Sequence, residues 1–281
     1  MSSTYQATMP SPRPSAAHPE SPDGGGRQVP QSVCHALRPR SARYAVCVFV
    51  INEGDRLLAQ LKRMQQAPHG LDVIIADGGS QDGSTAVARL SELGVTALLV
   101  KQGPGKLSAQ MRMALDWCLE QGYAGVIVMD GNNKDDPAAL PCFAAALDAG
   151  CDHVQGSRFI PGGRAVHTPW LRYLGLRLVH APLVSLAAGF RYSDTTNGFR
   201  GYSRKLLTDD RVQPFRDVFD RYELHYYLAI RAARLGFRVT EVPVTREYPA
   251  AGPTPSKIHG WRGNGVILGT LIKACAGWFD P

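Results

Sequence analysis

The sequence has no long hydrophobic run. Its first uninterrupted apolar stretch, Ala45 to Ile51, is far too short to cross a bilayer. No N-terminal segment has the basic, apolar and small-residue order of a signal peptide. We therefore expect a cytoplasmic protein.

Closely spaced cysteines are also lacking. The 281 residues include six cysteines, but none forms a C-x-x-C pair or a dense cluster. This spacing argues against a disulfide framework and against a zinc site, so we expect reduced and mostly buried cysteines. The net charge of +7 favours polyanionic partners, which include nucleic acid, an anionic membrane surface and phosphorylated small molecules. Charge alone does not choose among them.

The first 40 residues have little apolar periodicity. They are rich in Ser, Pro and Gly, with three consecutive glycines at positions 24–26. Such a segment cannot bury enough surface to offset its ordering entropy. We predict a disordered tail over residues 1–40 and one folded domain over residues 41–281.

From Tyr44 onward, short apolar runs alternate with amphipathic segments. The pattern predicts strands at 44–51, 71–76, 95–100 and 125–129, and helices at 56–66, 84–93 and 108–121. Further on it predicts strands at 154–159 and 238–244, and helices at 170–188, interrupted at Pro182, and at 220–235. This alternation is typical of βαβ units, so the predicted fold is α/β with a mostly parallel central sheet flanked by helices.

Three polar loops follow three of the predicted strands. They contain Asn52 with Glu53, Asp77 with Asp82, and Asp130 with Asn132. A single such carboxylate is often only a helix cap. Parallel sheets, however, bind ligands at the carboxyl ends of their strands. Three acidic loops at that edge suit a site that binds a base, a ribose and, through a divalent ion, a diphosphate.

A glycine-bearing turn precedes the helix predicted to begin at Ser108. Gly103, Pro104, Gly105 and Lys106 form this turn, and backbone N–H groups at a helix start can bind phosphate. The turn lacks the Walker signature, so a plain turn is the alternative.

The motifs together resemble glycosyltransferase family 2, and within it the dolichol-phosphate mannosyltransferase-like branch. The resemblance runs from about Tyr44 to Lys257. It rests on an ordered series of matches: VINEGD, DGGSQDGS, MDGNNKDDP, Gly156-Ser157-Arg158, DTTNGFR at 194–200, EVPV at 241–244 and Ser256-Lys257.

The resemblance implies a GT-A fold and an inverting transfer of a sugar from a UDP- or GDP-sugar. On the donor side, it implies contacts from Asp77 to the base, from Glu53 to the nucleotide edge and from Asp130 to Mg²⁺ or Mn²⁺. It further implies nucleotide contacts from Asn52, Gly79, Ser80 and Asp82, a metal contact from Asn132, and contacts of Arg158, Arg200 and Lys257 with the diphosphate or an anionic acceptor. Lys106, in the glycine-bearing turn, is a further candidate for a phosphate contact of the donor.

Three positions depart from the family pattern. Gly78 stands where the family usually has a second Asp, Asn132 replaces the second Asp of the metal motif, and Lys134 occupies the position of a common Gln. A lysine there is expected either to weaken metal binding or to supply part of the counter-charge for the diphosphate.

The acceptor is expected to be a polyprenyl phosphate, with a soluble hydroxyl compound as the alternative. A hydroxyl needs a base, for which Asp194 and Glu223 are the candidates, although either could instead hold an arginine in place. The segment from Trp170 to Tyr192 mixes leucines with arginines, so it is either an interfacial membrane helix or a helix packed on the sheet. We expect peripheral membrane contact and no nucleic-acid partner. A nucleotidyltransferase or a non-catalytic nucleotide-binding protein would also use an α/β nucleotide site.

Overall fold

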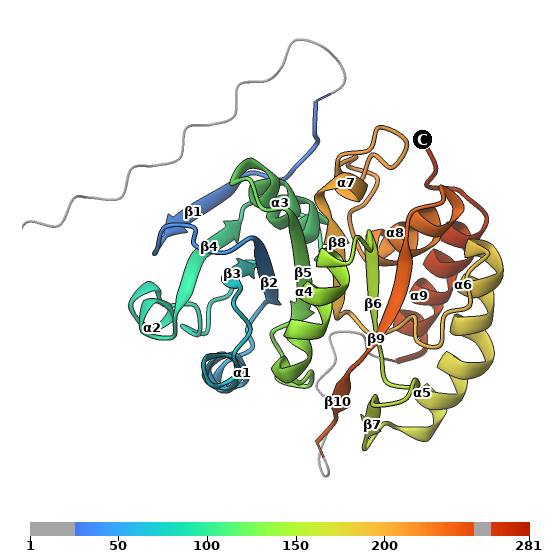
Figure 1. Ribbon diagram of the computed structural model, residues 1–281, viewed down its shortest axis with the longest axis horizontal. Helices are drawn as coiled ribbons and strands as arrows, with labels where there is room; N and C mark the ends of the chain where they lie inside the picture. Colours follow the sequence, from blue (N-terminus) through green and yellow to red (C-terminus); the bar gives the residue numbers. More distant parts are fainter. Residues whose placement is uncertain (1–25, 250–259) are drawn as a thin grey trace, which may run out of the picture.

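An eight-stranded sheet runs through the centre of the computed structural model, which describes residues 26–249 and 260–281 (Figure 1). The strand order is β1-β4-β3-β2-β5-β8-β6-β9. The strands are β1 Ser32–Ala36, β2 Tyr44–Val50, β3 Asp72–Asp77, β4 Val95–Lys101, β5 Gly125–Asp130, β6 His153–Ser157, β8 Arg200–Ser203 and β9 Val239–Pro243. Strands β4, β3, β2 and β5 run parallel to one another, and β9 runs parallel to β6. The antiparallel pairs are β1 with β4, and β8 with both β5 and β6.

Helices cover both faces of this sheet because its central strands are apolar on both sides. In β2, Ala45, Cys47 and Phe49 face one core, while the residues between them face the other. The first core is completed by α3 Leu107–Glu120, α6 Ala181–Ala188, α8 Glu223–Arg234 and α9 Gly260–Cys275. The second is completed by α1 Asp55–Gln66, α2 Val87–Glu92 and α4 Leu140–Asp148. The expected α/β architecture is therefore confirmed.

A second, two-stranded sheet lies beyond the main one. Strands β7 Arg164–Val166 and β10 Thr245–Glu247 pair in parallel, and they lie together below the main sheet in Figure 1. An isolated bridge joins Asp135 to Arg246, which ties the loop after β5 to β10. The other short elements are the turns η1 Pro137–Ala139 and η2 Leu176–His180 and the helices α5 Trp170–Gly175 and α7 Arg204–Leu207.

The predicted tail over residues 1–40 is wrong for its last part. Residues 32–36 form β1, which lies antiparallel along the edge of β4. The sequence has little local sign of this strand because its stability comes from backbone pairing with β4, a partner more than sixty residues away. The predictions for residues 1–25 lie outside the described residues.

The helix predicted at 170–188 is present but is divided into three parts. The segment Leu176–His180 is a π-helical turn between α5 and α6. It ends just before Pro182, whose missing N–H removes one hydrogen bond to the preceding turn. The interruption predicted at Pro182 is therefore found one turn earlier, where the backbone widens.

Candidate active site

The three polar loops meet at one edge of the sheet, on either side of β2. The strand register places Val50 opposite Asp77 on β3 and Phe49 opposite Asp130 on β5. This is the point where successive strands switch from one side of β2 to the other, and parallel α/β sheets bind ligands at such a point. The register of β2 with β3 and β5 therefore brings the three loops together, as expected from the sequence.

Glutamines from two helices hold this edge in place. The buried Gln110 of α3 donates from its Nε2 to the carbonyls of Val50 and Ala76. On the other face, the Nε2 of Gln60 donates to the carbonyl of Asp130 at 2.9 Å, and its Oε1 accepts from the Asn133 N–H at 2.7 Å. The loop after β5 is therefore fixed by α1, and the ends of β2 and β3 by α3.

Asp77 organises its own loop. Its Oδ1 accepts hydrogen bonds from the Gly79 and Ser80 N–H groups and from the Ser80 hydroxyl, at 2.7–3.0 Å. Its Oδ2 accepts from the Thr85 hydroxyl at 3.0 Å. These four bonds use the carboxylate's usual acceptor capacity. A contact of Asp77 with a base stays a prediction.

Asn52 and Asp82 join the first two loops. The Asn52 N–H donates to the Ser80 hydroxyl at 2.9 Å, and its Oδ1 accepts from the Gln81 N–H at 2.8 Å. Asp82 accepts from the Gly54 N–H at 2.8 Å. Asn52 has a φ of 49°, a left-handed conformation that asparagine tolerates well. The loops around residues 52–54 and 78–84 therefore form one unit, and Glu53 lies within it in an ion pair with Arg56.

Asp130, the expected metal ligand, is paired with an arginine. Its Oδ2 lies 3.0 Å from Nη2 of Arg246, and the Asn132 side chain donates to the same oxygen at 3.3 Å. Although burial raises the pKa of Asp130, the charge and hydrogen bond of Arg246 bring it below its ordinary value. Arg246 also forms a short ion pair with the buried Asp135. Sequence reasoning missed Arg246, which is a single arginine in a short edge strand with no motif of its own.

The two positions assigned to a divalent ion do not offer it an open set of oxygen ligands. Asn132 is neutral, and its Oδ1 accepts the Lys134 N–H at 3.3 Å. Within residues 26–249 and 260–281, no group of three His, Cys, Asp or Glu side chains is placed to hold a metal ion. A divalent cation prefers several carboxylate or carbonyl oxygens, whereas here N–H donors approach one oxygen of Asp130.

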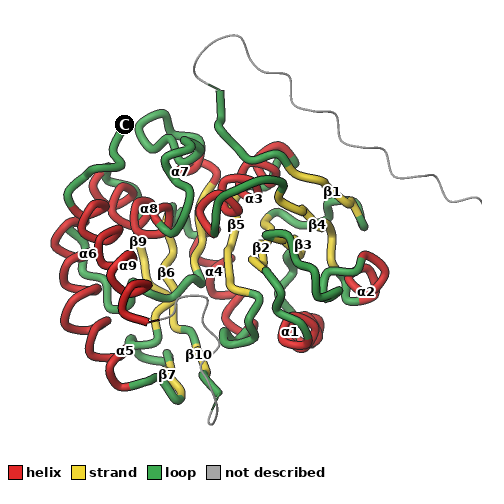
Figure 2. The backbone as a smooth tube through the Cα atoms, turned by 180° about the vertical axis from the view of Figure 1, so that it is seen from behind, coloured by secondary structure: helices red, strands yellow, loops and turns green. Residues whose placement is uncertain are grey.

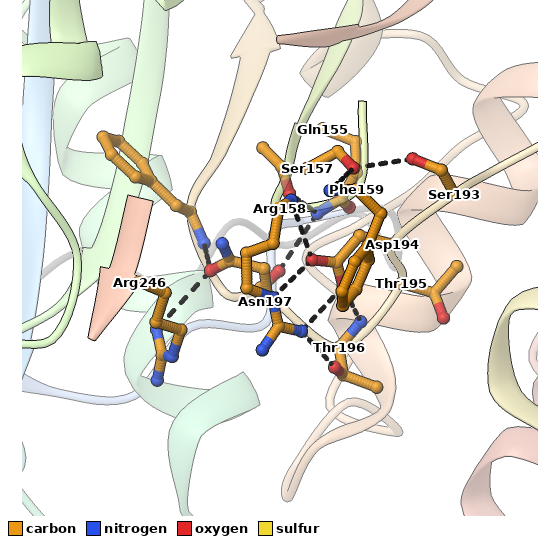
Figure 3. Close-up of polar contacts among 12 residues, drawn as sticks. Gln155, Ser157, Arg158, Phe159, Ser193, Asp194, Thr195, Thr196, Asn197 and Arg246 are labelled. Carbon is orange, nitrogen blue, oxygen red and sulfur yellow. Dashed lines mark hydrogen bonds and ion pairs between the residues drawn. The ribbon is translucent and has the colours of Figure 1, made fainter. Parts of the chain in front are cut away.

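Arg158 and Asp194 bind each other (Figure 3). Nε and Nη2 of Arg158 lie 2.7 and 2.9 Å from the two carboxylate oxygens, and both side chains are at most 1% exposed. The same guanidinium reaches the Thr196 hydroxyl. Glu241 accepts from the Ser193 and Asp194 N–H groups and so fixes the backbone beneath the pair. Of the two predicted roles for Asp194, a base or an arginine partner, this geometry supports the partner. It also leaves Arg158 without the open face expected for a diphosphate contact.

Arg200 is a structural residue as well. Its guanidinium donates to the carbonyls of Thr195, Asn197 and His225, and the residue is 2% exposed in the interior. It therefore positions the loop at 195–197, and a contact of Arg200 with an anionic substrate stays a prediction.

The glycine-bearing turn does not form an open phosphate site. Its Lys106 N–H donates to the Asp220 carbonyl, and the Ser108 N–H donates to the Arg221 carbonyl. The start of α3 is thereby covered by the segment that leads into α8. The Lys106 side chain itself is exposed, with its Nζ 5.8 Å from the centre of the Tyr222 ring.

Glu223 lies at the start of α8, beside a cavity of about 370 Å³. The cavity is also lined by Arg221, Thr270, Lys273 and Phe279. Glu223 accepts the Arg221 N–H at 2.7 Å and is 8% exposed. The remaining predicted site residue, Lys257, lies outside the described residues.

Residues 45–211 match the family described as Glycosyl transferase family 2. The chain belongs to this family. It is a glycosyltransferase, and its fold is that of the GT-A enzymes.

Two curated relatives fall in the branch that the sequence motifs indicated. The chain is 30% identical to polyprenol monophosphomannose synthase of Mycolicibacterium smegmatis, over 74% of this chain and 78% of that protein. It is 29% identical to undecaprenyl-phosphate mannosyltransferase of Micrococcus luteus, over 72% of this chain and 83% of the relative. The resemblance to the dolichol-phosphate mannosyltransferase-like branch is confirmed.

A solved structure shares the fold. Glucosyl-3-phosphoglycerate synthase of Mycobacterium tuberculosis, in complex with Mn²⁺, UDP and phosphoglyceric acid, superposes with a TM-score of 0.57 at 18% identity. The match covers 83% of this chain and 78% of that one. At this identity it establishes the fold alone.

Among the described residues, no helix has the length and apolar character needed to span a bilayer.

Proposed function

We propose that the protein transfers a hexose from a UDP- or GDP-sugar to a polyprenyl phosphate with inversion at the anomeric carbon. Two curated relatives are named for transfer to polyprenol and undecaprenyl phosphate carriers. The observation that carries the proposal is the junction of the loops at the carboxyl ends of β2, β3 and β5, where parallel sheets bind nucleotides.

The nucleotide is proposed to bind against the joined loops at 52–54 and 78–84. Asn52, Gly79 and Asp82 are exposed there, and Glu53 and Ser80 are half-buried beside them. Because the two loops hydrogen-bond to each other before any ligand arrives, the donor meets a preformed surface. Preformed surfaces lose less conformational entropy on binding.

The transfer itself exchanges one carbon–oxygen bond for another. A phosphate oxygen of the acceptor forms a bond to the anomeric carbon, and the bond from that carbon to the diphosphate breaks. The nucleoside diphosphate leaves with the electron pair. An anionic acceptor has no proton to lose, so this step needs no base.

The pairing of Asp194 with Arg158 favours the anionic acceptor over a hydroxyl compound. Both oxygens of the Asp194 carboxylate accept guanidinium N–H groups of Arg158 in a buried ion pair, so neither oxygen is open to a hydroxyl acceptor. Glu223 is the other candidate base, and it lies in a cavity with Arg221 and Lys273. If the acceptor were a hydroxyl, Glu223→Gln would abolish transfer. For a polyprenyl phosphate we expect this variant to keep its maximal rate.

The charge on the leaving diphosphate must be stabilised, but no step is assigned to a metal ion. Asp130 and Asn132 are engaged with N–H donors, and they do not fit the ligand set that a divalent ion prefers.

Peripheral membrane contact is proposed through the helices that follow β7 and through α9. Large apolar side chains are exposed along this layer, where α5, α6 and α9 lie together on one side of the molecule (Figure 2). They include Trp170, Leu171, Leu178 and Leu186 from the first helices and Ile272 and Trp278 from the C-terminal end. Exposed basic residues on the same segments, Arg172, Arg177 and Lys273, suit anionic headgroups. A lipid-linked acceptor would be reached from this surface.

The test is a donor and acceptor matrix with the purified full-length chain. UDP- and GDP-hexoses are combined with a short polyprenyl phosphate or with a pool of hydroxyl acceptors, and product is followed by mass spectrometry. Product on the lipid phosphate supports the proposal. Product on a hydroxyl compound alone, or no nucleotide sugar raising the melting temperature, would refute it.

A further inference from the structure

Gly198 lies against the carboxylate of Asp130, at the edge of the sheet where the polar loops meet. A Cβ at this position would lie 3.2 Å from Oδ1 of Asp130 and 3.6 Å from its Cγ. We propose that Gly198 is a specificity-determining residue, and that the hexose of the donor contacts Asp130 in the space left by the missing side chain. This inference rests on the proposed function, because the hexose is the group that the proposed reaction transfers.

The register of β8 with β5 places the two residues side by side. These strands are antiparallel, and Val128 on β5 pairs with Arg200 on β8. Two residues further along β5, Asp130 therefore stands opposite Gly198. Strand β8 thus begins at the edge where β2, β3 and β5 end, and residues 194–198, which lead into it, form a fourth loop at that edge.

The ends of four neighbouring strands form a row that is long enough for the whole donor. The row runs from Asp77 on β3, past β2, to Asp130 on β5 and then to Gly198. Neighbouring strands are about 4.8 Å apart, so the row is about 14 Å long. A nucleotide sugar carries its base, ribose, two phosphates and hexose in series. When its nucleoside lies on the joined loops at 52–54 and 78–84, its hexose reaches the other end of the row.

One oxygen of Asp130 is available to that hexose. Arg246 and the Asn132 side chain both donate to Oδ2, whereas no group of the described residues donates a hydrogen bond to Oδ1. The Asp130 side chain is 28% exposed, and Gly198 is half-buried beside it. A carboxylate oxygen accepts hydroxyl groups in charge-assisted hydrogen bonds, which are stronger than those between neutral groups. Oδ1 is therefore placed to accept a hydroxyl of the hexose.

Neither residue can easily move to admit a side chain at position 198. The neighbours of Gly198 in the chain, Asn197 and Phe199, are fully buried. The Asn197 Oδ1 accepts the Phe199 N–H at 3.0 Å, and the Gln155 side chain donates to the Asn197 carbonyl at 3.2 Å (Figure 3). Asp130 is held from its other side by its ion pair. The backbone of Gly198 is not in the left-handed region, so the position calls for glycine because of space and not because of conformation.

The experiment compares the binding of a nucleotide sugar with the binding of the same nucleoside diphosphate. Titration calorimetry with the full-length chain measures the dissociation constants of UDP, GDP and their hexose conjugates. Gly198→Ala places a methyl group between the hexose and Oδ1 of Asp130. We expect this variant to bind the nucleotide sugar about tenfold to 100-fold more weakly, which is the loss of one hydrogen bond to a charged group. Its affinity for the nucleoside diphosphate should be unchanged.

Two further variants test whether the effect belongs to the space at Gly198. Gly78→Ala adds the same methyl group at the other end of the row, where a Cβ makes only ordinary contacts, the nearest at 3.4 Å from the Val50 carbonyl oxygen. Thr196→Val removes the hydroxyl that accepts from Arg158, and so perturbs the same loop without adding an atom at position 198. In both variants, the ratio of the two dissociation constants should keep its wild-type value.

The outcomes separate the two proposals. If Gly198→Ala leaves the ratio of the two dissociation constants unchanged, the role of Gly198 is overturned and the proposed function stands. A ratio that changes as much in Thr196→Val as in Gly198→Ala also overturns it, because the order of the loop would then be the cause. If the wild-type protein binds no nucleotide sugar, the proposed function itself fails.

Discussion

Arg158 and Asp194 form an ion pair that is shut off from solvent, with both carboxylate oxygens bound by one guanidinium. Removing one partner leaves an uncompensated buried charge, which typically costs about 3–5 kcal/mol. We predict that Asp194→Ala lowers the free energy of unfolding by that amount, as measured by denaturant titration. The exposed pair of Arg43 with Asp148 is the control, and Arg43→Ala should cost less than about 1 kcal/mol.

This prediction distinguishes a structural Asp194 from a catalytic one. A catalytic base would lose activity on substitution while stability changed little. If Asp194→Ala unfolds at the wild-type denaturant concentration but no longer transfers sugar, Asp194 is the base and its role as an arginine partner is wrong.

Gly131 gives the second prediction, because it directly follows Asp130. A Cβ at this position would lie 2.4 Å from Cγ1 of Val50 and 3.1 Å from the Phe49 carbonyl oxygen. The end of β2 cannot shift to make room without moving Asp130. Gly131→Ala should therefore lower the free energy of unfolding by about 1–3 kcal/mol and should also reduce kcat. Unfolding curves and steady-state kinetics measure the two effects.

Gly175 provides the matched control for that substitution. A Cβ there meets nothing within 4 Å, and the residue is the last of α5. Gly175→Ala should leave kcat unchanged and should not destabilise the protein, since alanine favours helix over glycine by up to about 1 kcal/mol. If the two variants had the same kcat and the same free energy of unfolding, the close packing around Gly131 would not be what holds Asp130 in place.

The sequence was informative where apolar runs were long. Strands β2, β3, β4 and β5 were predicted almost to their ends, since each is buried on both faces and reads as a continuous β-prone segment. The short strands β8 and β10 were not predicted. Strands of four residues (β8) and three residues (β10) are too short to show an alternation of apolar and polar residues. They form only because a neighbouring strand supplies the hydrogen-bond partners.

The motifs identified the family and the edge of the sheet but not the partners of each side chain. Arg158 and Asp194 were both recognised as candidate site residues, but their ion pair was not predicted. The two residues are 36 positions apart, and a local sequence pattern does not indicate such a contact. Arg246 was missed for the same reason. It lies 116 positions from Asp130, and only the fold brings them together.

His153 gives the third prediction. Burial and the nearby charge of Arg200 lower its pKa to about 3, from an ordinary value of 6.5. The folded protein therefore keeps the ring neutral, while the unfolded chain takes up a proton below pH 6.5. This contribution of His153 to the stability of the folded protein is fully present above pH 6.5 and is lost as the pH falls towards 3. Between pH 7 and pH 5, we expect His153 to reduce the free energy of unfolding by about 2 kcal/mol.

The contribution of His153 is isolated by substitution. Neither ring nitrogen has a hydrogen-bond partner among the described residues, so His153→Leu removes the titration without breaking a hydrogen bond. Denaturant titrations of both proteins at pH 7 and pH 5 should show a smaller loss in the variant. Parallel pH dependences would mean that His153 is protonated equally in the folded and unfolded states.

The exposed leucines of η2 and α6 give the fourth prediction. Leu178 and Leu186 are 70% and 84% exposed, so replacing both with serine should change the free energy of unfolding by less than about 1 kcal/mol. If this surface enters the interface of a membrane, the loss of two large apolar side chains should weaken vesicle binding by about tenfold to 100-fold. Flotation with vesicles containing anionic lipid measures the bound fraction.

Val33→Ser is the control, since Val33 is also exposed but lies on β1 at the opposite side of the molecule (Figure 1). Equal flotation of the wild type and the double variant would exclude this helix layer as the membrane-binding surface, and transfer to a lipid-linked acceptor would then require a different approach to the site.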